Sequence, residues 1–190
     1  MASNNGGSSP AGLTQIRIGG YGGQGIILTG MLLGKAASLY DGKFAVFTQS
    51  YGPEARGGAS SADVVISDTR IDYPLVTEPD ILVVLFQEAY MRFRPGLKRG
   101  GVLILESDLV RPNEGDTSVS GIPATRIATE LGRRIVTNVV VFGYTVGKTG
   151  AVSRAAAEKA IQATVKPKTV ELNMRAFNAG FELAMQEVAV

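Results

Sequence analysis

The chain has 190 residues, 45% of them apolar and 19% charged, so it can bury the core of one ordinary domain. It has no Cys and no His, which excludes disulfides, thiol catalysis and metal or iron–sulfur ligation by thiolate or imidazole. We therefore expect any chemistry to come from a cofactor or a partner chain, and a net charge of +2 without a basic run argues against nucleic-acid binding.

The N-terminal segment is rich in Gly and Ser. Residues 1–13 predict a flexible tail, and 14–190 predict the folded domain. The segment has no basic stretch followed by an apolar one, as a secretory signal would. No apolar stretch reaches the ~20 residues of a membrane span. We expect a cytoplasmic protein without a membrane span.

Strands and helices alternate along the rest of the chain. The patterning predicts strands at 15–18, 44–48, 61–67, 81–86 and 101–106. It predicts helices at 26–40, 87–97 with a break at Pro95, 123–131, 138–147, 153–165 with Ser153 as cap, and after Thr169, and a loop at 109–118. This alternation indicates α/β architecture: a single Rossmann-like domain with a mostly parallel twisted sheet flanked by helices and a helical C-terminal portion.

Apolar residues recur at spacings of three and four in the last predicted helix. They are Val170, Met174, Phe177, Phe181, Met185 and Val188. Such a stripe predicts the face that packs on the core.

A glycine cluster separates the first strand from the first helix. Gly20, Gly22 and Gly25 match G-x-G-x-x-G, with Gly23 and Gln24 between them. Glycines let the backbone turn tightly and approach a phosphate, which then meets the N–H groups of the helix N-terminus. The cluster predicts a phosphate site, with a tight turn that binds nothing as the alternative.

The second strand lacks the acid that a dinucleotide site uses to hold ribose hydroxyls. It ends in Thr48-Gln49-Ser50. Asp41 lies about 20 residues beyond the motif but precedes the strand. This argues against NAD and leaves room for another phosphate-bearing cofactor.

A second glycine-rich loop runs from Ser50 to Gly58 and includes Arg56. An Arg on flexible backbone can clamp a phosphate or carboxylate. A solvated turn in which Glu54 pairs with Arg56 explains the same residues equally well.

Several longer segments together resemble a known family. They read IRIGGYGGQGIILTG, TQSYGPEARGGASSADVVIS, IDYPLV, PDILVVLFQEAY, GGVLILESDLV, IPATRIATELG and SRAAAEKAIQATV. Over 15–183 the chain is similar to the gamma subunit of CoA-acylating 2-oxoacid:ferredoxin oxidoreductases. It departs from the family pattern in residues 1–13 and at Phe86, where a small residue is more usual, and neither departure touches the motif loops.

The resemblance implies a subunit without a catalytic residue or metal ligand of its own. In this family the alpha and beta subunits bind thiamine diphosphate with magnesium, and a ferredoxin-like subunit holds iron–sulfur clusters. The complex oxidatively decarboxylates a 2-oxoacid to an acyl-CoA and passes electrons to ferredoxin or NAD. The gamma subunit helps to bind coenzyme A and closes over the active site.

The resemblance also implies site residues. The phosphate role falls on Gly20, Gly22, Gly23, Gln24 and Gly25. The second wall of the coenzyme A or active-site cleft falls on Ser50, Tyr51, Arg56, Gly57 and Gly58. Asn138 is a further candidate for this cleft, with a plain helix N-cap as the alternative.

The loop SYGPEARGG is more similar to the 2-oxoglutarate type than to the pyruvate type, and an aromatic acid such as phenylglyoxylate is a further possibility. Two other readings stay open. One is a stand-alone NAD(P)-binding Rossmann oxidoreductase, and the other is a scaffold whose glycine loops are turns only.

Overall fold

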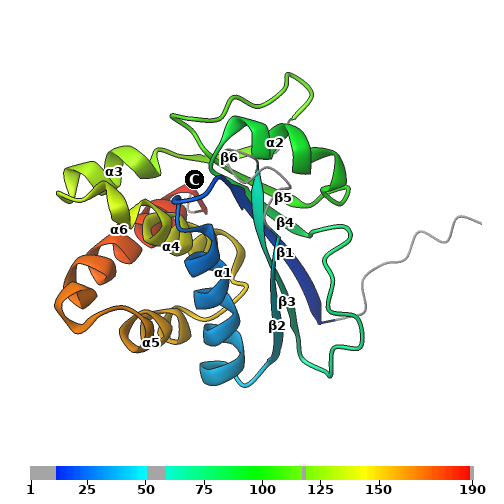
Figure 1. Ribbon diagram of the computed structural model, residues 1–190, viewed down its shortest axis with the longest axis horizontal. Coiled ribbons are helices and arrows are strands. Elements are labelled where there is room, and N and C mark those ends of the chain that lie inside the picture. The colour runs from blue at the N-terminus through cyan, green and yellow to red at the C-terminus, as the bar shows by residue number, and fades with distance from the viewer. Residues whose placement is uncertain (1–11, 51–58, 117–118, 189–190) are drawn as a thin grey trace, which may run out of the picture.

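The computed structural model describes residues 12–50, 59–116 and 119–188 (Figure 1). Its strands are β1 (Leu13–Gly20), β2 (Phe44–Ser50), β3 (Ser60–Ser67), β4 (Ile81–Val84), β5 (Val102–Glu106) and β6 (Val119–Ile122). Its α-helices are α1 (Ile26–Lys35), α2 (Gln87–Phe93), α3 (Ala124–Glu130), α4 (Thr137–Thr149), α5 (Arg154–Thr164) and α6 (Val170–Val188). No helix in these ranges is long and apolar enough to cross a lipid bilayer.

Short irregular turns extend several helices. A π-helical turn, Ala36–Tyr40, continues α1, and a 3₁₀ turn, Arg94–Gly96, ends α2 at the predicted proline break. Ser153 caps α5 as predicted, because its Oγ accepts a hydrogen bond from the Ala156 N–H. The predicted helices are therefore confirmed, with ends that shift by a few residues.

The six strands form one sheet in the order β2-β3-β1-β4-β5-β6. β3 is antiparallel to both of its neighbours, whereas β1, β4, β5 and β6 pair in parallel. Five of the six strands thus run in the same direction, which confirms the mostly parallel sheet. β1 begins at Leu13, opposite Ser67, so the strand takes in the last residue of the predicted tail.

Both faces of the sheet are covered. Figure 1 shows α1, α4, α5 and α6 on one side, where they bury Ile16 and Ile18 of β1 and Val83 of β4. On the other side α2 packs over Leu82 and Val84 of β4 in a smaller core. Because alternate residues of β4 point into different cores, the strand is apolar throughout, as parallel strands between two helical layers are.

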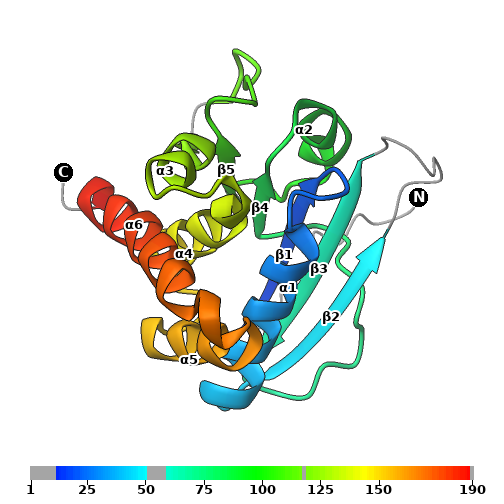
Figure 2. The same ribbon diagram turned by 60° about the vertical axis from the view of Figure 1, so that its left-hand side comes forward.

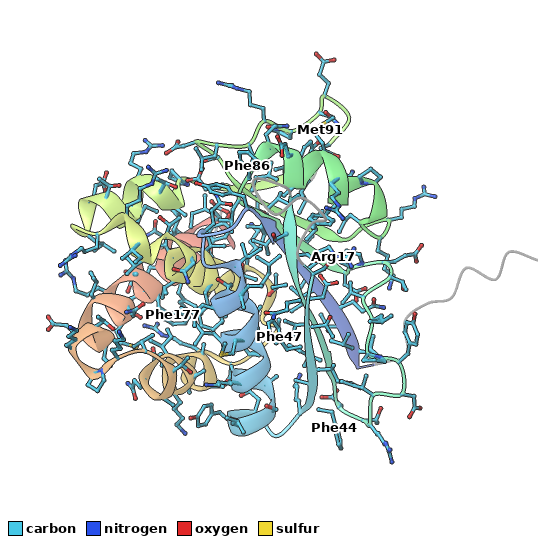
Figure 3. The ribbon with its side chains drawn as sticks, in the orientation of Figure 1. Arg17, Phe44, Phe47, Phe86, Met91 and Phe177 are labelled. Atoms are coloured by element: carbon cyan, nitrogen blue, oxygen red, sulfur yellow. The ribbon has the colours of Figure 1, made fainter. Side chains whose placement is uncertain are left out.

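The smaller core borders an ion pair between neighbouring strands. Arg17 of β1 donates to Asp63 of β3 across 2.6 Å and also to the carbonyl oxygen of Val76. Its guanidinium lies over the ring of Phe93 in α2, 5.4 Å from the centroid. Figure 3 shows Arg17 at the sheet and Phe177 among the helices.

The sequence patterns missed β6. This strand has four residues, Val-Ser-Gly-Ile, of which only Ile122 is fully buried. A strand so short, with a Ser and a Gly in its centre, gives almost no periodic signal. It forms because the exposed edge of β5 offers backbone partners.

The predicted stripe on α6 is only partly correct. Phe177 is fully buried, but Met185 is 46% exposed. The closest approaches to α4 involve small residues, because Gly180 lies against Val140 and Ala184 lies against Gly147. Figure 2 shows α6 alongside α4. Periodicity of large residues located the helix but not its tightest contact.

Candidate functional site

The candidate site lies where the carboxyl ends of β1 and β4 meet. The helix after β1, α1, contacts the sheet on one face, and the helix after β4, α2, covers the other. The two connections therefore diverge and leave a crevice between adjacent strand ends. Open α/β sheets bind their ligands at such a point.

The loop Tyr21–Gly25 is held in place by the side chain of Gln24. Its Oε1 accepts a hydrogen bond from the Tyr21 N–H at 2.9 Å, and its Nε2 donates to the Leu85 carbonyl oxygen at 2.9 Å. The Gln24 amide thus joins the loop after β1 to the end of β4. Because both ends of the amide form hydrogen bonds within the protein, Gln24 shapes the loop.

The glycines of the motif fall into two groups. A Cβ on Gly20 would lie 2.6 Å from the Gln24 Oε1, and a Cβ on Gly25 would lie 2.7 Å from the Asn138 side chain. At Gly20 and Gly25 the space that a side chain would fill is occupied by other protein atoms. Gly22 and Gly23 have no atom of the described residues within 4 Å of such a Cβ, so this part of the structure leaves them open. Gly23, with φ +95°, and Gly25, with φ +74°, adopt a backbone that favours glycine.

Asn138 is buried in the first turn of α4, directly behind this loop. Its Nδ2 donates to the carbonyl oxygen of Gly25 at 3.4 Å, and its own carbonyl oxygen accepts from the Thr29 hydroxyl. The residue before α4 is Val136, so Asn138 is not the helix N-cap. The structure places Asn138 as a support of the glycine loop.

The second predicted wall is only partly within the described residues. Ser50 ends β2 opposite Ser61, one residue from the pair that Gly20 forms with Ser60, so it lies at the same end of the sheet. Tyr51, Arg56, Gly57 and Gly58 lie outside the described residues. Their predicted role stays a prediction.

A cavity of about 310 Å³ opens beside the glycine loop. The loop, the ends of β4 and β5 and the segment before α4 line it, through Tyr21, Gly23, Gln24, Leu85, Glu106, Leu109, Thr125, Arg134, Ile135 and Thr137. Ile135 is 81% exposed at its rim. The cavity therefore combines polar walls with an apolar edge.

Phe86 contributes to this region, contrary to the expectation that it would not touch the motif loops. It precedes α2, and its ring meets that of Tyr21 edge to face, with 5.1 Å between centroids. Figure 3 labels Phe86 at this end of the sheet. The unusual aromatic residue supports the tyrosine of the glycine loop.

Glu106 is the functional candidate that the sequence reasoning missed. It ends β5 and is 1% exposed, and its Oε1 accepts a hydrogen bond from the Thr125 N–H at 2.9 Å. Its Oε2 is buried and has no hydrogen-bond partner among the described residues. The available signal was an acid at the carboxyl end of an otherwise apolar strand.

The site suits an anion with polar substituents. No side chain of the described residues caps the N-terminus of α1, and N–H groups there favour negative charge. Arg134 adds a positive charge to the cavity wall. No group of acidic side chains suited to a metal ion occurs within the described ranges. Phosphate binding is the chemistry that the geometry supports.

Comparisons with known proteins find relatives over most of the chain. Residues 15–183 match the family described as Pyruvate ferredoxin/flavodoxin oxidoreductase. The 2-oxoglutarate synthase subunit KorC of Methanothermobacter marburgensis is 54% identical over 90% of this chain and 97% of its own length. The pyruvate synthase subunit PorC of Methanothermobacter thermautotrophicus is 36% identical over 90% and 95%.

A solved structure agrees as well. The gamma subunit of a keto/oxoacid ferredoxin oxidoreductase from Geobacter sulfurreducens is 45% identical, with a TM-score of 0.80, over 91% of this chain and 99% of its own. The resemblance that the motifs indicated is confirmed by these matches, and so is the Rossmann-like fold.

Proposed function

The chain belongs to the pyruvate ferredoxin/flavodoxin oxidoreductase family, and from this premise we propose that it helps to bind coenzyme A and closes over the active site of a thiamine diphosphate-dependent complex. The complex oxidatively decarboxylates a 2-oxoacid to an acyl-CoA. As a gamma subunit of an oxidoreductase, the chain supplies binding surface and no reacting side chain.

The open face of the glycine loop carries this proposal. Gly22 and Gly23 leave space above the backbone at the N-terminus of α1, where free N–H groups attract an anion. Coenzyme A carries a pyrophosphate and a 3′-phosphate, so it offers the anion that such a surface binds. The Arg134 side chain in the cavity wall fits the same charge. Gly20, Gln24, Gly25 and Asn138 then act by shaping the loop.

The second loop has a proposed role at the same end of the sheet. We assign Ser50, Tyr51, Arg56, Gly57 and Gly58 to the other wall of the coenzyme A or active-site cleft. The position of Ser50 beside the end of β1 supports this assignment.

We propose 2-oxoglutarate as the substrate. The relative at 54% identity is a 2-oxoglutarate synthase subunit, whereas the pyruvate synthase subunit is 36% identical over a similar length. An aromatic 2-oxoacid such as phenylglyoxylate is the second candidate, because the acid itself would contact mainly other chains. The SYGPEARGG loop favours the first.

The partners follow from the proposed reaction. Alpha and beta subunits would hold thiamine diphosphate and magnesium, which supply the carbanion chemistry of decarboxylation. A ferredoxin-like subunit would hold the iron–sulfur clusters, for which this chain has no Cys, and ferredoxin or NAD would accept the electrons. The chain's own residues would bind the nucleotide end of coenzyme A and keep water from the site.

Anaerobic co-purification from the native host tests the proposal. A tagged copy should recover chains that contain thiamine diphosphate and iron–sulfur clusters, and the recovered complex should bind coenzyme A in equilibrium dialysis. A host strain with the tag on an unrelated protein is the control. Recovery of a lone chain that binds NAD tightly, with coenzyme A unable to compete, would instead establish a stand-alone dinucleotide enzyme.

A further inference from the structure

We propose that Glu106 recognises the adenosine end of coenzyme A by accepting a hydrogen bond through its Oε2. The ligand donor is the 6-amino group of adenine or the 2′-hydroxyl of ribose. This inference rests on the proposed function and assigns a part of the ligand to a particular side chain.

The two oxygens of Glu106 have different surroundings. Oε1 accepts from the Thr125 N–H, which ties the end of β5 to the start of α3. This contact accounts for only half of the carboxyl group. Oε2 is equally buried, and no group in the described part of the chain forms a hydrogen bond with it. Burying an acceptor without a hydrogen bond is costly, so an orphan oxygen beside a cavity indicates a missing donor.

The donor must enter from the cavity, because Glu106 lines it. The same cavity reaches Gly23 of the glycine loop and Arg134 before α4. One ligand therefore has to place a phosphate at the loop and a hydrogen-bond donor at Glu106. A nucleotide meets both, since its phosphates are anionic and its base and sugar carry neutral N–H and O–H groups.

Two observations favour the adenosine end of coenzyme A over the pantetheine end. The rim of the cavity is apolar, with Tyr21, Leu109 and Ile135 all substantially exposed, and such side chains suit the flat face of a base. The thiol of coenzyme A must also reach the reacting centre on other subunits. The pantetheine arm therefore leads away from this chain, and the adenosine remains.

Glu106 lies at the end of a different strand from the acid that binds ribose in NAD sites. That acid ends the second strand of the fold, on the far side of β1 from β4. Here β2 ends in Ser50, and the acid ends β5, two strands from β1 in the other direction. The ligand should thus extend over β4 and β5, opposite to the adenosine of NAD.

The test measures coenzyme A binding to the assembled complex by isothermal titration calorimetry without 2-oxoacid. Glu106→Gln keeps the oxygen that accepts from the Thr125 N–H. It replaces Oε2 with the NH2 of a side-chain amide, which donates hydrogen bonds and cannot accept one. Glu130→Gln, at an exposed position in α3, is the matched control. Losing one hydrogen bond to a charged group should weaken binding roughly 10- to 100-fold in Glu106→Gln and leave the control unchanged.

Two coenzyme A analogues identify the donor. One has unsubstituted purine in place of adenine and so lacks the 6-amino group, and the other lacks the 2′-hydroxyl. The analogue without the true donor should bind the wild type as weakly as coenzyme A binds Glu106→Gln, and the variant should not distinguish the two ligands.

The outcomes separate this inference from the function on which it rests. If the wild-type complex binds coenzyme A and Glu106→Gln binds it equally well, the role of Glu106 is overturned and the proposed function stands. If the wild-type complex does not bind coenzyme A, the proposed function fails. Should Glu106→Gln fail to assemble, the analogues decide alone: equal binding of both analogues and coenzyme A by the wild type overturns the inference.

Discussion

The chain uses glycine for opposite purposes at two places, the contact between α4 and α6 and the loop after β1. A Cβ on Gly143 would lie 2.0 Å from the Phe177 carbonyl oxygen, and one on Gly180 would lie 2.0 Å from that of Val140. At the loop, Gly22 and Gly23 have no atom from residues 12–50, 59–116 or 119–188 within 4 Å of such a Cβ. The helix contact is filled with protein, whereas the loop surface is open.

This difference separates a structural glycine from one that we propose contacts the ligand. In the helix pair the missing side chains let two backbones meet, and the space is used within the fold. At the loop the missing side chains leave a surface that the fold does not use. Substitutions at the two places should therefore change different quantities, stability at the first and ligand affinity at the second.

Gly180→Ala should give the largest effect. The new methyl group would overlap the Val140 carbonyl oxygen, so α6 must move away from α4, and the free energy of unfolding should fall by about 3 kcal/mol. Urea denaturation followed by circular dichroism measures it. Gly34→Ala in α1 is the matched control, since its Cβ would lie 3.7 Å from the Phe47 Cβ and it should be neutral or slightly stabilising. Equal stability of both variants would contradict a structural role for Gly180 in the contact between α4 and α6.

Gly22→Ala should leave stability nearly unchanged and weaken coenzyme A binding by the complex roughly tenfold. The added methyl group meets no atom of the part of the chain that the structure describes, but it covers backbone that the phosphate should approach. Gly96→Ala, equally open but before β5 at the other end of the sheet, serves as the control. Calorimetric titration gives the affinity and thermal unfolding gives the stability. An unchanged affinity would indicate that this glycine forms a turn only.

Tyr144→Phe should give the smallest effect and should concern stability alone. Burial and the hydrogen bond to the Glu187 carboxylate raise the pKa of the buried Tyr144 hydroxyl above its ordinary value of 10. The stability that depends on this proton is present below about pH 10 and is lost as the pH rises further. The variant should lose about 1 kcal/mol at neutral pH and some of this alkaline sensitivity.

Denaturation curves at several pH values measure the effect of Tyr144→Phe. Tyr73→Phe, at a side chain that is 60% exposed, is the control and should match the wild type throughout. Coenzyme A affinity should be the same in all three proteins. A loss of affinity in Tyr144→Phe would show that the helix contact and the loop are coupled.

Much of the fold could be predicted from local patterns. The strand, glycine cluster and helix at the start of the chain have strong signals, because β-branched residues, turn-forming glycines and helical periodicity follow one another directly. β6 could not be predicted, since its four residues form a strand only beside β5. The close contact of α6 with α4 was missed because small residues carry it, while the pattern of large residues pointed to Met185.

The candidate site was predictable in its loop and not in its cavity. The motif located Gly20 to Gly25, but not which glycines face protein and which face open space. The sequence reasoning missed Glu106 because the apolar pattern that identifies β5 says nothing about the polar residue at its end. Its importance depends on Thr125, 19 residues further on, which satisfies one oxygen and leaves the other free.

The two hydrogen bonds of the Gln24 side-chain amide affect how fast and how tightly a ligand could bind at the glycine loop. Glycine-rich loops have high conformational entropy, and ordering one on ligand binding would subtract from the affinity. Here the Gln24 amide fixes the loop to Leu85 when the chain folds. The entropy of the loop is therefore lost during folding and not during ligand binding. A ligand bound at this loop, as we propose, would meet a preorganised surface and would not have to order the loop.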